Sequence, residues 1–173
     1  MACTSVLTPI SITCDNNIGG LSNIYVVPRY FITSFGTETA SVLSGVTLSG
    51  TTKLVEYQFN KNTASYTDVL ATNFENGSSI YQQTINLMIP RREAAKRTSI
   101  ALLAAGQRDL VVIAKDYNGI YWLFGKDSGL QLQSIGEGSG TAKADGSKYS
   151  LVLYGEEPYS AVTITEANVL TLI

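Results

Sequence analysis

Residues 110–124 read Leu110-Val-Val-Ile-Ala-Lys-Asp-Tyr-Asn-Gly119-Ile-Tyr-Trp-Leu-Phe124. Two apolar runs, rich in β-branched and aromatic residues, flank an Asp-Tyr-Asn-Gly turn, which is a strong sequence signal for a β-hairpin. The second run, 120–124, is apolar on both faces of a strand. We therefore expect core on one side of it and either core or a subunit interface on the other.

Working outward from this hairpin, short alternating or β-branched segments recur along most of the chain, which is typical of strands. We expect further strands at 10–14, 24–33, 55–59, 65–72, 85–89, 130–135, 149–154 and 162–164. The turn at 60–62 predicts that 65–72 pairs with 55–59.

Residues 91–105 form the one convincing helix pattern. They are Ala-rich, lack Gly and Pro, follow Pro90 and precede Gly106, as expected of a helix with a glycine C-cap. One helix among about ten strands predicts a mainly β fold, an antiparallel β-sandwich or partly rolled barrel with that helix on its flank.

The length of 173 residues fits a single domain spanning 1–173. Residues 34–53 are rich in Ser, Thr and Gly, and we interpret them as a long loop that carries at most a short hairpin. Loops of this length within compact domains are usually functional. We expect this loop to cross to another subunit, which would bury its apolar residues Val42, Leu43, Val46 and Leu48.

Composition excludes much chemistry. The chain has no His, which rules out Ser-His-Asp and Cys-His catalysis and imidazole ligands for zinc. Cys3 and Cys14 are too few for a four-cysteine zinc site; we favour free thiols, and a disulfide between them stays open. Charged residues reach only 15% and the net charge is −2, so global charge does not favour nucleic-acid binding. We therefore expect no metal site, no cofactor and no enzymatic activity.

Two weaker patterns suggest sites but have simpler interpretations. Gly136, Gly138 and Gly140 are not followed by a helix, so we favour a hairpin loop over a phosphate cradle. Glu156 and Glu157 are the only adjacent carboxylates, and a solvated turn is the favoured interpretation. The N-terminus lacks a signal-peptide pattern and no apolar run spans a bilayer, so we expect a soluble protein folded in a cytoplasm.

The most informative cluster is basic: Arg91, Arg92, Lys96 and Arg97 lie at the start of the predicted helix. Positive charge there opposes the helix macrodipole, although Glu93 is spaced to pair with Arg97. We interpret the cluster as facing an anionic surface, either carboxylates of a neighbouring subunit such as Glu156 and Glu157, or DNA phosphates. The alternative is an ordinary solvated helix face.

Several stretches together resemble a known group of proteins. They are the strand pair around 55–72, the helix start Pro90-Arg91-Arg92, the run Leu110-Val-Val-Ile-Ala-Lys-Asp-Tyr-Asn-Gly119, and the segments Tyr121-Trp-Leu-Phe-Gly125 and Ser128-Gly129-Leu130. Over about residues 20–173 the chain resembles tail-tube-like and ring structural proteins of tailed bacteriophages, specifically crAss-like phages of Bacteroides.

The resemblance implies a β-sandwich with one flanking helix, whose copies close into a ring around a channel for DNA. It implies that the loop at 34–53 grips a neighbouring copy, and it supplies no catalytic residues. Channel walls in this family are usually not basic, so we place Arg91, Arg92, Lys96 and Arg97 at a subunit contact.

The expected function is thus a non-enzymatic virion protein that forms a ring or tube, hexameric or dodecameric, in the phage tail or neck. Its partners would be copies of itself, adjacent virion proteins and DNA in transit without sequence-specific binding, and no membrane. It would be made in the host cytoplasm. A bacterial β-sandwich binding or adhesin module is the alternative, and an enzyme is a third class.

Overall fold

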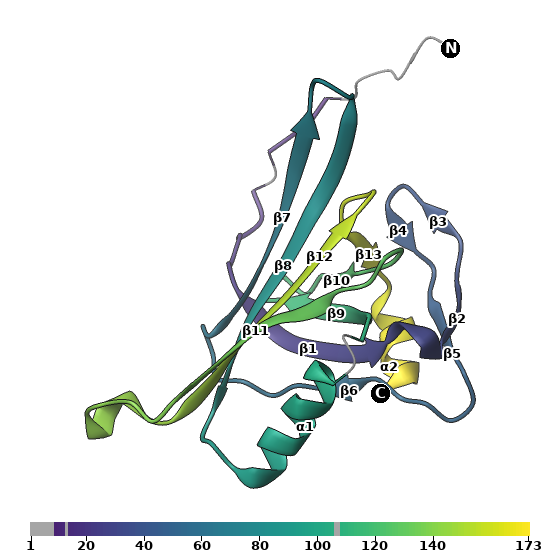
Figure 1. Cartoon of the computed structure of the whole chain (residues 1–173). Coiled ribbons are helices and arrows are strands. Elements are labelled where there is room, and N and C mark those ends of the chain that lie inside the picture. Colours follow the sequence, from purple (N-terminus) through teal and green to yellow (C-terminus); the bar gives the residue numbers. More distant parts are fainter. Residues whose placement is uncertain (1–8, 13, 106–107) are drawn as a thin grey trace.

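The structure is a computed structural model that describes residues 9–12, 14–105 and 108–173. Most of its strands lie in two sheets (Figure 1). In spatial order, the seven-stranded sheet contains β3 (Glu38–Thr39), β4 (Val42–Leu43), β13 (Val162–Ile164), β10 (Tyr121–Phe124), β9 (Leu110–Asp116), β1 (Leu21–Pro28) and β6 (Val55–Glu56). The four-stranded sheet contains β11 (Gln131–Gly138), β12 (Lys148–Glu157), β8 (Ser78–Pro90) and β7 (Ala64–Asn73).

The remaining elements are short. They are a two-stranded sheet of β2 (Ile32–Phe35) and β5 (Val46–Leu48), the helices α1 (Ala94–Ala104) and α2 (Glu166–Leu172), and the 3-10 turns η1 (Arg29–Phe31) and η2 (Lys143–Asp145). The prediction of a mainly β fold is confirmed. The prediction of a single helix is wrong, because α2 closes the described chain, and β13 pairs with β4 in parallel rather than antiparallel.

The hairpin predicted at 110–124 is confirmed and lies inside the seven-stranded sheet. β9 and β10 pair antiparallel from Lys115 opposite Tyr121 to Val112 opposite Phe124. Gly119 in the connecting turn has a φ of 85°, a backbone conformation that glycine adopts without steric cost. β1 pairs with the other edge of β9, so β9 has a neighbour on each side.

One core fills the space between the two sheets. Alternate residues of β1, β9 and β10 meet alternate residues of β8 and β12 there, since successive side chains of a strand point to opposite faces. The fully buried members include Ile24, Val112, Phe124, Ile85 and Leu151.

A second core covers the opposite face of the seven-stranded sheet. Val111, Ile113 and Leu123 project into it. The cover comes from this same chain: Val169 of α2 is buried against these residues. Two cores of one chain therefore cover the two faces of β10, while Ile120, before the strand, is exposed.

The segment at 34–53 is not one long loop. It contains β3, β4 and β5, and β5 pairs with β2 while β4 pairs with β13. Leu43 and Val46 are buried in the second core, and Leu48 packs against it; among the four predicted interface residues, Val42 alone is exposed. We expected the apolar residues of this segment to need a second subunit for burial. That expectation is wrong, because β4, β5 and α2 of the same chain contribute to a core that buries Leu43 and Val46.

Strand pairing also differs from the prediction at 55–72. β7 pairs with β8 through the turn at 74–77, whereas β6 is short and pairs with β1. Residues 10–12 of the predicted strand at 10–14 are exposed and form no strand, and residue 13 lies outside the described residues. Cys14 is an exposed free thiol, and Cys3 lies outside the described residues.

The predicted helix at 91–105 is present but begins at Ala94. β8 continues to Pro90, which lies opposite Lys148 of β12. Arg91 then takes a left-handed φ of 62° and turns the chain away from the sheet. Gly106, the predicted C-cap, lies outside the described residues.

Candidate functional site

The β7–β8 hairpin extends past the other strands of the two sheets at one end, and the described N-terminal residues run in the same direction (Figure 1). β12 stops opposite Tyr81, so the hairpin continues beyond that rung as two strands only. We call residues 69–82 the hairpin arm; at its base, Tyr81 and Gln82 still pair with β12. Among the described residues β7 is the edge strand of its sheet, so no described strand pairs with the backbone groups along its outer side.

Apolar side chains of the hairpin arm are uncovered. Phe74 at the tip is 95% exposed, and Val69 and Leu70, which point to opposite faces of β7, are 53% and 50% exposed. A two-stranded hairpin alone in water is marginally stable, so a partner that covers these side chains would stabilise it. The arm is therefore the strongest candidate interaction surface in the described residues.

Local side-chain contacts shape the arm at its tip. The Oδ1 atom of Asn73 accepts the backbone N–H of Glu75 at 2.9 Å, and Asn76 Oδ1 accepts that of Ser78 at 3.0 Å. Gly77 closes the turn with a φ of 71°. These contacts hold Phe74 outside the turn.

The base of the arm is attached to the body of the molecule. Oδ2 of Asp68 accepts hydrogen bonds from the Ser160 hydroxyl and the Ala161 backbone N–H, both at 2.8 Å. The residue directly before the hairpin arm is therefore held by hydrogen bonds to the segment that precedes β13.

The four basic residues predicted at a subunit contact lie at the opposite end of β8. Arg91 and Arg92 precede α1, and Lys96 and Arg97 lie in its first turn. The structure therefore brings these four residues together, as predicted. Their place at a subunit interface stays a prediction.

Three of these cations have partners within the chain. Arg91 Nε lies 2.8 Å from Glu93 Oε1, Lys96 Nζ lies 3.8 Å from Glu93 Oε2, and Arg92 forms an ion pair with Glu137. The predicted Glu93–Arg97 pair is absent from the described residues. The premise of uncompensated charge therefore holds only for Arg97, which is exposed.

Charge differs between the two ends of the β7–β8 pair. No Lys or Arg occurs between Lys61 and Arg91, where Asp68 and Glu75 are the only charged residues. At the other end, residues 91–97 and 137–148 together hold six Lys or Arg and three acidic residues. The arm thus carries one charge, the carboxylate of Glu75, and the far end of the same sheet carries a net positive charge.

The two predicted acidic partners differ in accessibility. Glu157 is 2% exposed, and its carboxylate accepts the backbone N–H groups of Asp127, Ser128 and Gly129, each at 2.9 Å. Its carboxylate is therefore engaged within the chain. Glu156 is exposed and accepts the Tyr154 hydroxyl at 2.8 Å, so a neighbour could still reach it.

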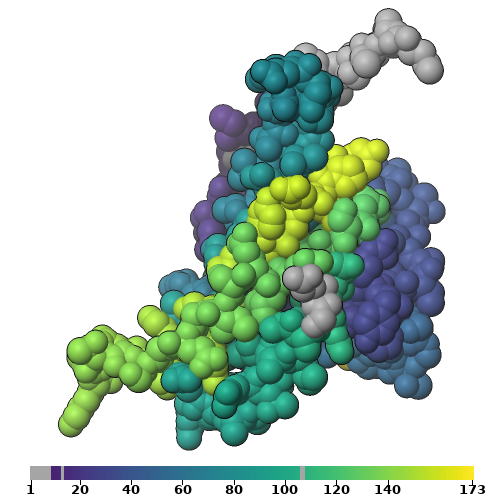
Figure 2. Space-filling view, in the orientation of Figure 1, coloured from purple at the N-terminus to yellow at the C-terminus, as the bar shows by residue number. Residues whose placement is uncertain are grey.

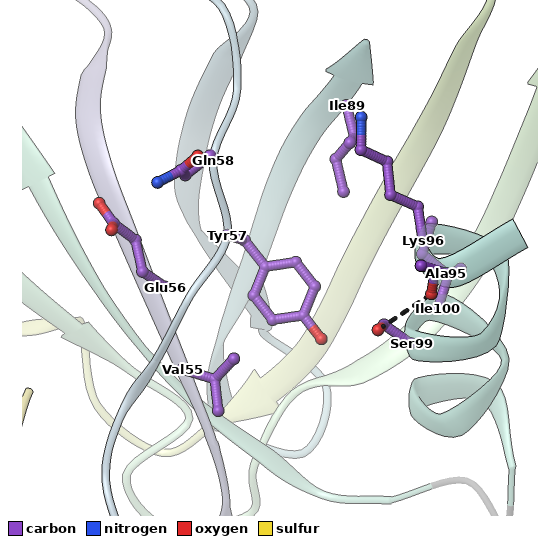
Figure 3. A pocket seen from close by; sticks show the side chains of 9 residues that line it. All are labelled: Val55, Glu56, Tyr57, Gln58, Ile89, Ala95, Lys96, Ser99 and Ile100. Carbon is purple, nitrogen blue, oxygen red and sulfur yellow. Dashed lines mark hydrogen bonds between the residues drawn. The ribbon is translucent and has the colours of Figure 1, made fainter. Parts of the chain in front are cut away.

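A groove of about 310 Å³ lies between α1 and the segment that follows β6. Figure 3 shows Tyr57 projecting into it with its hydroxyl toward Ser99 of α1. Burial raises the pKa of Tyr57 above its ordinary value of 10.0. Lys96 Nζ donates to the Pro90 carbonyl at 2.7 Å and the Ser99 hydroxyl donates to the Ala95 carbonyl at 3.3 Å. Both groups are thus engaged in structural contacts.

A second groove of about 300 Å³ lies between the C-terminal half of α1 and β11. It is lined by Leu103, Ala104, Leu132, Gln133, Ser134 and Ile135. These two elements lie side by side on the face shown in Figure 2. Four of the six lining residues are apolar, while polar and apolar atoms contribute about equally to its surface, and the neighbouring Leu102 is 56% exposed. We call this the α1/β11 groove.

A third, wider groove of about 510 Å³ is lined by aromatic and polar residues, among them Trp122, Lys126 and Tyr159. Trp122 is half-buried, and its indole N–H donates to Asp116 Oδ2 at 3.2 Å. Tyr159 is exposed. Lys126 pairs with Glu38 across the groove, so the charge in this groove is balanced.

The sequence contained a signal for the arm that the strand prediction did not use. Asn76-Gly77 between two β-rich segments favours a hairpin, and pairing 65–72 with residues after that turn would have placed Phe74 at a tip. The α1/β11 groove had no such signal, since its residues come from segments distant in sequence.

No group of three or more His, Cys, Asp or Glu side chains in residues 9–12, 14–105 and 108–173 is arranged to hold a metal ion. Over the same residues, no helix is both long and apolar enough to cross a membrane. Comparisons of the chain with known protein families, with curated proteins and with solved structures found no match.

Proposed function

We propose that this chain is a non-enzymatic structural protein that assembles with copies of itself, as a ring or tube component of a bacteriophage tail or neck. The fold in this proposal is a tail-tube-like β-sandwich of the two sheets with α1 on its flank. The observation that carries the proposal is the hairpin arm, whose apolar residues Val69, Leu70 and Phe74 are uncovered.

The charge distribution supports association between different surfaces of two copies. Glu75 of the arm and the net positive charge of the far end are of opposite sign, whereas two arms would bring two like charges together. A contact between two different surfaces repeats from copy to copy, and it yields a closed ring when the rotation closes. A ring of six or twelve copies with a central channel for DNA belongs to the proposal.

Light scattering and electron microscopy of the full chain test this proposal. We expect a concentration-dependent oligomer with ring-shaped particles. Replacing residues 71–80 by Asn-Gly between Leu70 and Tyr81 removes the arm tip and keeps the hairpin register. That variant should remain folded and monomeric. A full chain that stays monomeric at high concentration would overturn the proposal.

A binding or adhesin module is the second candidate, and the groove beside Trp122 and Tyr159 favours it. The exposed ring of Tyr159 and the half-buried ring of Trp122 lie next to polar groups whose charges cancel, which suits a neutral oligosaccharide. Calorimetry with oligosaccharides separates the two candidates. A monomer whose sugar binding is lost in Tyr159→Ala would support this second function and exclude the first.

A further inference from the structure

We propose that the hairpin arm of one copy inserts its tip into the α1/β11 groove of a second copy. This inference rests on the proposed self-assembly and names the two surfaces that meet. The two surfaces carry complementary apolar and charged groups, and they lie at different places on the molecule.

The apolar contact in this proposal is between Phe74 of one copy and the α1/β11 groove of the other. Phe74 is 95% exposed at the end of a projecting hairpin. The groove, about 300 Å³ in volume, has Leu103, Leu132 and Ile135 in its lining, so an aromatic ring seated in it would contact three aliphatic side chains. A buried aromatic anchor in a pocket is the usual centre of an interface.

The charged contact in this proposal is between Glu75 of one copy and Arg97 of the other. Glu75 directly follows Phe74, and the arm has no basic residue. Arg97 lies seven residues before Ala104, two turns earlier on the same face of α1. In the described part of the chain the Arg97 side chain has no ion pair. A tip seated beside Ala104 would therefore bring a carboxylate toward an available cation.

The arm reaches a second copy and not its own groove. β8 has 13 residues between the arm tip and the start of α1, which corresponds to roughly 40 Å of extended strand. Figure 1 shows the arm and α1 at opposite ends of the molecule. Each copy would thus use its arm on one neighbour and its groove on the other.

Cross-linking tests the contact directly. In a chain carrying Cys3→Ser and Cys14→Ser, Thr72→Cys, which keeps Phe74, is introduced into one preparation and Ala104→Cys into another. We expect a short bismaleimide to join the two chains when they are mixed and to join neither preparation to itself. Cross-linking of Thr72→Cys chains to each other, or no cross-link in the mixture, would overturn the docking.

A groove-filling pair of variants provides the matched control. Ala104→Trp fills the α1/β11 groove, while Ala95→Trp places the same side chain nine residues earlier, on the opposite face of α1. Ala104→Trp should weaken assembly about tenfold or more, as should Phe74→Ala. Ala95→Trp should leave assembly unchanged.

The outcomes separate this inference from the proposed function. If the full chain forms rings and Ala104→Trp forms them equally well, the docking is wrong and the proposed function stands. If the full chain is a monomer, both fail. Rescue of assembly in a mixture of Glu75→Arg and Arg97→Glu chains, each defective alone, would add support from the charged pair.

Discussion

The carboxylate of Glu157 accepts the backbone N–H of Gly129 at 2.9 Å, and the side chain that carries it is 2% exposed. The N–H groups of Asp127 and Ser128 complete the same contact. A buried carboxylate is stable when hydrogen-bond donors replace water. The last residue of β12 thereby fixes the turn that follows β10.

Replacing Glu157 should destabilise the fold. In Glu157→Gln, one acceptor oxygen becomes an amide that donates, so at least one buried N–H loses its partner. We expect a loss of about 1–3 kcal/mol in the free energy of unfolding, measured by urea denaturation. Glu156→Gln, at an exposed position, is the control and should change stability by less than about 0.5 kcal/mol. Equal stability of the two variants would contradict this account.

The segment at 34–53 should behave as part of the fold. Leu43→Ala removes a fully buried side chain from the second core and should cost about 2–5 kcal/mol. Val42→Ala, one residue earlier and exposed, should have little effect. Thermal melts of both variants test this. A small effect of Leu43→Ala would mean that the segment is not packed on its own chain.

The ion pair of Glu166 with Lys115, at 3.1 Å, should give a stability contribution that depends on pH. Hydrogen bonds from Lys115 and then Tyr121 lower the pKa of Glu166 below its ordinary value of 4.5. Since the folded pKa is the lower one, the stabilisation is present above pH 4.5 and disappears as the pH falls through the folded value. An NMR titration of the Glu166 carboxyl should show the lowered pKa, and Lys115→Met should return it toward 4.5.

Gly125 should not tolerate a side chain. Its φ is 73°, and a Cβ atom would lie 2.7 Å from the Leu110 carbonyl oxygen and 2.9 Å from the Leu130 backbone nitrogen. We expect Gly125→Ala to destabilise by about 1–3 kcal/mol or more. Gly119→Ala has a similar φ of 85° but open space around the Cβ position, so the difference between the two variants in urea denaturation isolates the steric effect.

Local patterns predicted the elements well, but not all of their partners. The 110–124 hairpin and the strands near 130–135 and 149–154 follow from alternation and turn residues, which act over a few positions. The pairing of 65–72 was wrong because two turns, at 60–62 and at Asn76-Gly77, compete for it. In the structure β8 is the partner of β7, and it also pairs with β12, which lies far along the chain.

The helix α2 and the second core were missed for a related reason. Residues 166–172 are too few for a convincing periodic pattern, and β4 and β5 are only two and three residues long. Such elements are held by tertiary contacts: Asn168 Oδ1 accepts the Val46 backbone N–H at 2.9 Å. The basic cluster was predicted because its residues are close in sequence. Glu137, the partner of Arg92, was missed because it lies in β11, far along the chain.

The long strand β8 has a mechanical consequence for any assembly that pulls on the arm. Ten residues of β8 pair with β7 and ten with β12 in overlapping registers. The hydrogen bonds of antiparallel strands lie perpendicular to the strand axis. Tension along β8 would therefore act on both ladders in shear, with many bonds resisting together rather than opening in sequence. A pull sideways on the tip would instead peel the two-stranded end one rung at a time, so the arm is stiff along its axis and compliant across it.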